Sequence, residues 1–517
     1  MSTQTTPTPP ALGQPDARRD APLRLPAEEF KRAGHALVDA IADFLAEQPG
    51  KPVTTGETPD EIARLVAADA PLPAEGTEPA RLLAETSRLL FDHSLFNGHP
   101  KFFGYITSSP AHLGMLGDLL ASAVNANVGS WRLGPVATEI EAQTVRWIGE
   151  LLGYSPRGSA PAGLMVSGGN MANMVGLFAA RAHAIGADVR RRGLDRAGRW
   201  RVYASRETHT WLQKATDLAG LGTDSISWVD TDREQRMDLD ALRAAMVEDA
   251  ALGQRPLMIV GTAGSVSTGA VDPLPELAAI ARERGIWFHV DGAYGALAAL
   301  VPGAPEALRG LALADSVAVD PHKWLYAPIE AGCVLVRDAA LLRDAFSYHP
   351  PYYNFANEPL NFVDYGPQNS RGFRALKVWL QLRQVGRDGY LKMIGDDIAL
   401  AQRLHARCAE HAELEAMTLG LSIATFRFVP ADLRARAAEP EVAAYLDALN
   451  AQIVERLQRG GELFVSNAIV GGRYALRACI VNFNTTAGDV DAVPELVVRI
   501  GREVDGAERP ARLIRSQ

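Results

Sequence analysis

The sequence predicts an α/β protein with a mainly parallel sheet in its large domain, a helical N-terminal arm and a small C-terminal α+β domain. Two observations support this prediction. Short apolar segments alternate with helical ones from about residue 163, which is typical of a three-layer α/β domain. The 517 residues also exceed the size of one ordinary core. We expect a disordered leader over 1–25, the arm over 26–113, the large domain over 114–388 and the small domain over 389–517.

The spacing of apolar residues predicts the individual elements. Helices are expected over 26–46 and 80–91 in the arm, over 114–152 with a break at Gly134-Pro135, and over 171–184 and 239–249. Strands of the large sheet are expected over 164–167, 201–204, 225–229, 257–261, 287–291, 316–319 and 333–336. In the small domain we expect a helix after residue 389, strands over 422–428 and 474–483, and a helix over 490–504.

Composition and charge exclude several classes of protein. A formal charge of -9, without a run of Lys and Arg, argues against a nucleic-acid partner and favours small-molecule ligands. No apolar run reaches the ~18 residues that a membrane span requires, so we expect no membrane partner. The Thr- and Pro-rich leader lacks the apolar segment of a secretion signal. Cys333, Cys408 and Cys479 lack metal-type spacing, which predicts reduced thiols, no metal and a cytoplasmic location.

Lysine is unusually scarce in this chain. Only seven of the 52 basic residues are lysines, at positions 31, 51, 101, 214, 323, 377 and 392. Chemistry that requires a primary amine, such as imine formation, therefore has few candidates, because a guanidinium is too weak a nucleophile.

A Gly-Gly turn lies between a predicted strand and a predicted helix, in Ser167-Gly168-Gly169-Asn170. Free backbone N–H groups and the positive end of the helix dipole favour a phosphate at such a position. An ordinary tight turn is the alternative. A P-loop is excluded, because Met171 and Ala172 stand where nucleotide hydrolases need Lys and Ser or Thr.

Three further residues are candidates for cofactor chemistry. Asp291 ends a predicted strand, at the edge where open α/β sheets bind ligands, and its carboxylate could keep a pyridinium nitrogen protonated. Lys323 follows another strand beside Trp324, where partial burial would favour the nucleophilic neutral amine. His209 precedes a predicted helix and could stack on an aromatic cofactor or transfer protons. The alternatives are a capping Asp, a surface Lys and a core His.

Six motifs follow one another in the sequence: His99-Pro100-Lys101-Phe102-Phe103-Gly104-Tyr105, Ser167 to Asn170, Thr208-His209, Gly269-Ala270-Val271-Asp272, His289-Val290-Asp291-Gly292-Ala293-Tyr294 and Asp320-Pro321-His322-Lys323-Trp324. Together they resemble the group II pyridoxal-phosphate decarboxylases, which include the aromatic L-amino-acid decarboxylases. The resemblance implies the aspartate-aminotransferase-like fold, called fold type I, with pyridoxal 5'-phosphate (PLP) as cofactor. It also implies a homodimer with active sites between the subunits.

The resemblance also implies roles for individual residues. Lys323 is similar to the Schiff-base lysine, Asp291 to the partner of the pyridine nitrogen and His209 to the histidine on the cofactor ring. The other implied cofactor contacts are Gly168, Gly169, His322 and Ser265, and the implied substrate contacts are Tyr105 and Phe103. Tyr352 matches the catalytic tyrosine of a loop that reaches the partner subunit, with Tyr353 as the neighbouring alternative. Trp131 could also line an aromatic pocket.

We therefore expect PLP-dependent decarboxylation of an L-amino acid, with an aromatic substrate preferred, to the amine and CO2. Two departures bear on the site: Ile106 replaces an aromatic residue, and Val266 follows Ser265 where the family often has a second Thr. The alternatives are an aromatic aldehyde synthase, a decarboxylase of a non-aromatic amino acid, an aminotransferase or carbon–sulfur lyase of the same fold, and a non-catalytic phosphate-binding module.

Overall fold

The computed structural model describes residues 21–155, 162–186, 188–194, 198–349 and 360–513. The chain divides into two compact units, one of residues 1–51 and 57–94 and one of residues 52–56 and 95–517. The expected leader lies almost entirely outside the described residues.

The first unit is helical. It contains α1 (Ala27–Glu47), α2 (Pro59–Leu65) and α3 (Pro79–Asp92). The rings of Phe44 and Phe91 stack with centroids 4.4 Å apart, which holds α1 against α3. Thr58 and Glu61 form a capping box at the start of α2. Helix α2 was not predicted, because seven residues are too few to show a helical period. The unit ends at Ser94, whereas the sequence placed the end of the arm at residue 113.

The second unit contains a seven-stranded sheet with the order β2-β8-β7-β6-β5-β3-β4. Its strands are β2 (Gly163–Val166), β3 (Trp200–Ser205), β4 (Ile226–Val229), β5 (Arg255–Thr262), β6 (Trp287–Asp291), β7 (Ser316–Val319) and β8 (Gly332–Val336). Only β8 runs against the others, because it pairs antiparallel with both β2 and β7. All seven predicted strands are present, and the predicted mainly parallel α/β sheet is confirmed.

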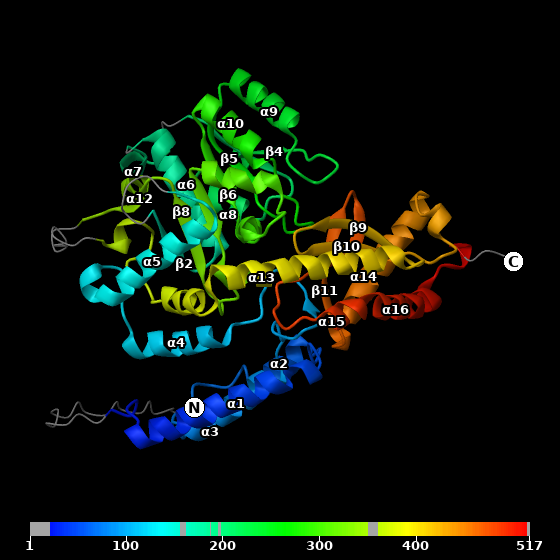
Figure 1. The fold of residues 1–517 in the computed structure, drawn as a ribbon, viewed down its shortest axis with the longest axis horizontal. Helices are drawn as coiled ribbons and strands as arrows, with labels where there is room; N and C mark the ends of the chain where they lie inside the picture. Colours follow the sequence, from blue (N-terminus) through cyan, green and yellow to red (C-terminus); the bar gives the residue numbers. More distant parts are fainter. Residues whose placement is uncertain (1–20, 156–161, 187, 195–197, 350–359, 514–517) are drawn as a thin grey trace, which may run out of the picture. The chain divides into compact units, whose positions relative to one another are not determined.

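Helices cover both faces of this sheet (Figure 1). Side chains alternate between the faces along each strand, so Leu164 and Val166 of β2 belong to one core while Met165 belongs to the other. The first core includes α6 (Gly169–Ile185), α8 (Trp211–Leu218) and α12 (Ala339–Phe346). The second includes α5 (Pro135–Leu151), α9 (Leu239–Ala251), α10 (Leu274–Arg284) and the first part of α13 (Ala375–Glu410). Three layers result.

A second, five-stranded sheet has the order β1-β11-β12-β10-β9. It consists of β1 (Phe102–Phe103), β9 (Leu414–Gly420), β10 (Ile423–Phe428), β11 (Phe464–Val470) and β12 (Arg473–Cys479), packed against α14 (Pro440–Gly460), α15 (Ala487–Asp491) and α16 (Val493–Glu508). β1 comes from the segment before the large sheet and pairs in parallel with β11, through Phe102 with Phe464. Sequence patterns missed β1, β9 and β11, and they extended β12 four residues too far.

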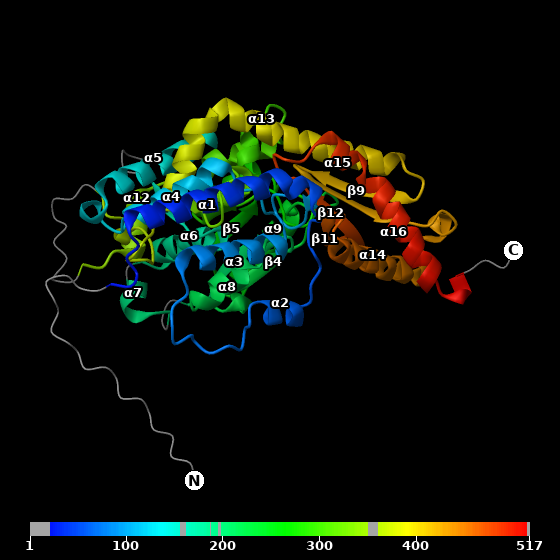
Figure 2. The same ribbon diagram turned by 90° about the horizontal axis from the view of Figure 1, so that it is seen from below.

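Helix α13 belongs to both cores. Figures 1 and 2 show it running from beside α5 to the C-terminal sheet. Its earlier residues, such as Val378, pack in the core of the large sheet, whereas Leu404 and Cys408 pack in the core of the five-stranded sheet. Gly386 has a left-handed φ of 67° and kinks the helix, two residues before the expected end of the large domain.

The three cysteines lie on three different elements. Cys333 is on β8, Cys408 on α13 and Cys479 on β12, and each is buried with a free thiol. No helix within the described ranges is both long enough and apolar enough to cross a bilayer.

Candidate active site

The residues predicted for cofactor binding lie at one edge of the large sheet. Gly168 and Gly169 follow β2, His209 follows β3, Ser265 follows β5, Asp291 ends β6, and His322 and Lys323 follow β7. Because the carboxyl ends of parallel strands lie at the same edge, the fold brings these segments together. Antiparallel β8 begins at that edge, and a Cβ on Gly332 would lie only 2.5 Å from Cα of Gly168.

Lys323 is on the short helix α11 (Pro321–Trp324) and pairs with Asp320. Its Nζ lies 3.1 Å from Oδ2 of Asp320, and Nε2 of His322 lies 3.5 Å from the same oxygen. Nδ1 of His322 accepts a hydrogen bond of 3.2 Å from the backbone N–H of Ala331. Burial lowers the pKa of His322, while the charge of Asp320 acts in the opposite direction. A partly exposed amine therefore faces a carboxylate that is 3% exposed.

The turn after β2 leaves space that only glycine permits. A Cβ on Gly169 would lie 2.7 Å from Oδ2 of Asp320 and 2.9 Å from Cβ of Ala293, and a Cβ on Gly168 would lie 3.2 Å from His322. Both glycines stand at the N-terminus of α6, whose first N–H groups lack helical partners. The bare turn beside Lys323 is therefore suited to a phosphate.

Asp291 is fixed by two donors. The indole Nε1–H of Trp211 donates to Oδ2 at 2.8 Å, and the backbone N–H of Ala293 donates to Oδ1 at 3.2 Å. The Asp291 side chain is buried at the end of β6, and Trp211 is fully buried in α8. A carboxylate held in this way can accept a hydrogen bond from a protonated ring nitrogen without first changing its orientation.

His209 lies near both Asp291 and Lys323. Burial is the main cause that lowers its pKa; the charge of Asp291 opposes this shift and the charge of Lys323 reinforces it. Nδ1 of His209 accepts a hydrogen bond of 3.2 Å from the backbone N–H of Trp211. The neutral imidazole must then carry its proton on Nε2. His209 can therefore present a neutral aromatic ring with one N–H donor.

Arg477 on β12 connects Tyr105 with Val266, the residue after Ser265. The guanidinium donates to the carbonyl of Tyr105 at 3.0 Å and to that of Val266 at 2.6 Å. The Ser265 hydroxyl lies 3.0 Å from that of Thr268 within the turn after β5. Tyr105 has a left-handed φ of 49° and is 57% exposed. Tyr105 therefore has a backbone conformation that non-glycine residues rarely adopt.

The side chain of Phe103 is not exposed beside Tyr105. It is fully buried in the core of the five-stranded sheet, because the pairing of β1 with β11 turns its side chain inward. The structure therefore leaves Tyr105 as the predicted substrate contact that is accessible. Trp131 precedes α5, where its indole donates to Glu139 at 2.9 Å. Tyr352 and Tyr353 lie outside the described residues.

Sequence patterns missed four residues that organise the site: Asp320, Trp211, Arg477 and Asp397. Asp320 could have been found, because it precedes Lys323 by three residues at the start of a helical turn. The other three act over distances that no local pattern encodes. Asp397, on α13, accepts hydrogen bonds from the Trp324 indole at 2.9 Å and the Tyr326 hydroxyl at 2.7 Å. It thus holds the segment that carries Lys323.

Asp397 gives a testable pH dependence. Burial raises its pKa to about 7, so the folded protein keeps a proton that the unfolded chain releases near pH 4. The free energy of unfolding should therefore fall as pH rises from about 4 to 7. We expect Asp397→Asn to remove this part of the decline, measured by chemical denaturation at several pH values.

Asp388→Asn, at an exposed position of the same helix, is the control for this measurement. Burial also raises the pKa of Asp272 to about 6. Asp272 therefore contributes to the fall in the free energy of unfolding with rising pH, in wild type and in Asp397→Asn alike. His289 acts oppositely: burial lowers its pKa to about 4, so stability is lost as pH falls below about 6.5. Parallel stability curves for wild type and Asp397→Asn would contradict the prediction.

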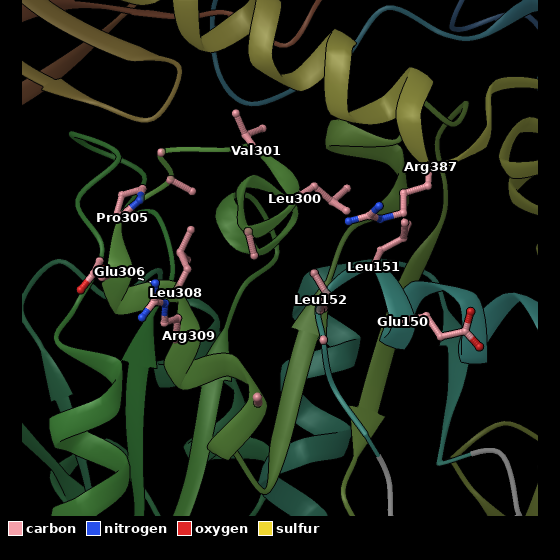
Figure 3. Close-up of a pocket in the computed structure, with 15 residues that line it drawn as sticks. Glu150, Leu151, Leu152, Leu300, Val301, Pro305, Glu306, Leu308, Arg309 and Arg387 are labelled. Carbon is pink, nitrogen blue, oxygen red and sulfur yellow. Dashed lines mark ion pairs between the residues drawn. The ribbon is translucent and has the colours of Figure 1, made fainter.

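A separate surface hollow of about 770 Å³ lies between the end of α5, the 3-10 segments after β6 and the kinked part of α13 (Figure 3). Arg387 extends toward Leu151 and Leu300 in this view. None of the predicted site residues lines it. The position at the strand ends, and not the size of a hollow, therefore locates the candidate site.

The fold and these side chains define an enzyme class that binds PLP. The glycine turn would offer space and N–H donors to the phosphate, Asp291 would offer an acceptor to a ring nitrogen, and Lys323 would offer the amine. Oδ1 of Asp320 and the hydroxyl of Thr262 are also buried at this edge without a hydrogen-bond partner among the described residues. The residues present are thus compatible with PLP.

Comparisons with known proteins give the family. The model described as "Pyridoxal-dependent decarboxylase conserved domain" matches residues 59–429. The aromatic-L-amino-acid decarboxylase of Bacillus atrophaeus is 32% identical over 489 residues, which cover 93% of this chain and 97% of that protein. Phenylacetaldehyde synthase of a Rosa hybrid cultivar is 29% identical over 466 residues, covering 88% and 90%. A crystal structure of Oryza sativa TDC with PLP and tryptamine has a TM-score of 0.85 and 27% identity, covering 94% of this chain and 99% of that one.

This chain belongs to the pyridoxal-dependent decarboxylase family. It is a PLP-dependent carboxy-lyase with the type I fold, and the resemblance inferred from its motifs is confirmed.

Proposed function

We propose that this enzyme converts an aromatic L-amino acid to its amine and CO2. The observation that carries the proposal is the convergence of Lys323, Asp291 and His209 at the carboxyl edge of the sheet, inside the segment that matches the family. The aromatic substrate is supported by the relatives named above and by Tyr105, whose ring lies 5.9 Å from that of Phe464 beside the site.

Each residue of the candidate site has a separate proposed role. Bound PLP supplies an electron-poor ring that accepts the electron pair left when CO2 departs. Lys323 would hold the cofactor covalently through its amine, and Asp291 would keep the ring nitrogen protonated. Gly168 and Gly169, with His322, would bind the phosphate. His209, neutral with its proton on Nε2, would cover the ring without adding charge.

A screen of purified holoenzyme tests the proposal. CO2 and amine are measured against the twenty amino acids plus dihydroxyphenylalanine, with hydrogen peroxide and ammonia in the same wells. We expect one or more aromatic substrates to release CO2 and amine in equal amounts. Release of CO2 from non-aromatic substrates alone would contradict the aromatic assignment.

An aldehyde synthase is the second candidate, because a phenylacetaldehyde synthase is among the relatives. In that reaction decarboxylation is coupled to oxidative deamination. Peroxide and ammonia in proportion to CO2, with little amine, would favour this candidate over the first.

We propose that Tyr352 returns the proton to the substrate carbon. A positioned general acid contributes ~10²-fold to 10⁴-fold, so Tyr352→Phe should slow amine formation at least ~10²-fold. Oxygen-dependent aldehyde formation should then compete. Tyr353→Phe is the matched control, and amine and aldehyde are quantified by chromatography. An unchanged amine rate in Tyr352→Phe would assign the proton to another group.

We also propose a homodimer with active sites between subunits. On α4 (His112–Val124), Leu116, Leu119, Leu120 and Val124 are each more than half exposed. Their spacing places them on one helix face, and an exposed apolar face of this kind is typical of an interface.

Leu120→Glu is expected to shift the protein from dimer to monomer and to reduce activity at low protein concentration. Light scattering after gel filtration measures the mass. Leu252→Glu, at an exposed leucine after α9, is the control. A dimer of unchanged stability in Leu120→Glu would place the interface elsewhere.

The proposal includes a cytoplasmic location. The free, buried thiols of the three cysteines support a reducing compartment. Fractionation of cells that express the protein, with activity followed in each fraction, tests this part.

A further inference from the structure

Trp211 contacts two of the residues assigned to the cofactor. Its indole N–H donates to Asp291 at 2.8 Å, and its backbone N–H donates to His209 at 3.2 Å. The Trp211 side chain is fully buried, so its bond to Asp291 does not compete with water, whereas the backbone bond to His209 is only partly buried. Trp211, at the start of α8, therefore orients both Asp291 at the end of β6 and His209 after β3.

The indole ring of Trp211 is itself held in place by His289. It meets the ring of His289 edge-on, with centroids 5.7 Å apart. His289 is bonded to the Ser316 hydroxyl and to Oδ1 of Asn173, both at 2.7 Å. Burial lowers the pKa of His289 to about 4, so it packs against Trp211 as a neutral ring. Strands β6 and β7 and helix α6 thus hold the indole rigid.

We propose that Trp211 is a positioning residue that orients the Asp291 carboxylate for the cofactor's ring nitrogen. Its indole N–H holds Oδ2 of Asp291 at 2.8 Å, and the backbone N–H of Ala293 holds the other oxygen at 3.2 Å. Without the indole donor, Asp291 would retain only the longer bond from Ala293, and its carboxylate would be free to rotate away from the ring nitrogen. This inference rests on the proposed function, since it assumes that Asp291 serves the cofactor.

The test is the affinity for PLP, measured by equilibrium titration of the apo-protein and followed by cofactor absorbance. Trp211→Phe should weaken binding about tenfold, because a buried hydrogen bond to a charged group is lost. Trp379→Phe is the matched control. Trp379 is partly buried and also donates one indole hydrogen bond, at 2.7 Å, but to Gln143 on α5. Binding by this control should stay within about twofold of wild type.

A double-mutant cycle shows whether Trp211 acts through Asp291. In an Asp291→Asn background, Trp211→Phe should cause no further loss of PLP affinity. A second tenfold loss in that background would mean that Trp211 acts by packing alone and would overturn the proposal. Wild-type affinity in the single variant would also overturn it. Failure of the wild-type protein to bind PLP would remove the proposed function as well.

If Trp211→Phe does not fold, the wild-type protein and Asp291→Asn still test the proposal. The eight tryptophans of the chain give indole signals in a ¹⁵N spectrum. One signal should shift between wild type and Asp291→Asn, and the same signal should shift when PLP is added. A spectrum in which no indole signal responds to both changes would refute the role of Trp211.

Discussion

Replacing Lys323 by alanine is expected to lower decarboxylation on the order of 10⁴-fold, because the covalent attachment of the cofactor is lost. The variant also leaves the buried Asp320 carboxylate without its ammonium partner at 3.1 Å. CO2 release from a saturating substrate measures the loss. Borohydride treatment of wild type should attach the cofactor to the peptide that contains residues 320–324.

Two further variants test whether activity requires the nucleophilic amine of Lys323 or only a positive charge at that position. Lys323→Arg can keep a cation beside Asp320 but lacks a nucleophilic amine, so it should be as inactive as the alanine variant. Lys392→Ala, at an exposed lysine paired with Asp396, should keep wild-type activity. Attachment of the label to any other lysine would disprove the assignment of Lys323.

Asp291→Asn is expected to lower the turnover number on the order of 10²- to 10³-fold, because the ring nitrogen loses its ionised partner. The amide remains the size of the carboxylate and can still accept the Trp211 indole at the 2.8 Å position. Folding should therefore be preserved, while cofactor affinity and turnover fall together. Steady-state rates and thermal unfolding of the apo-protein measure the two effects.

Asp249→Asn is the matched control for this variant. Asp249 is also buried, and it pairs with Arg201 at 2.9 Å away from the candidate site. Its replacement should lower stability without a selective effect on turnover. Equal losses of turnover in both variants would argue that Asp291 has only a structural role.

The large sheet could be predicted because its strands are short, apolar and separated by amphipathic helices, as for Trp287–Asp291 and Ser316–Val319. The same patterns placed Asp291 and Lys323 at strand ends, where a parallel sheet gathers its ligands. Residues of the site that follow a strand directly were therefore accessible to sequence reasoning.

Features that depend on pairings between distant parts of the chain could not be predicted from the sequence. Strand β1 has only two residues, and only its partner β11, far along the chain, identifies it as a strand. The burial of Phe103 in the core of the five-stranded sheet follows from that pairing. Likewise, the bond between Trp211 and Asp291 joins positions 80 residues apart, and a single sequence contains no signal for it.

The pairing of β1 with β11 bears on how the enzyme matures. Phe102 and Phe103 leave the ribosome long before Phe464 and Val465, their partners in the sheet. At translation rates of 5–20 residues per second, a nascent chain waits roughly 20 to 70 seconds for that partner. The seven-stranded sheet can assemble during this interval, since its last strand ends at Val336. Two adjacent phenylalanines then remain uncovered, which makes this stage a natural point for chaperone binding and for aggregation when synthesis stalls.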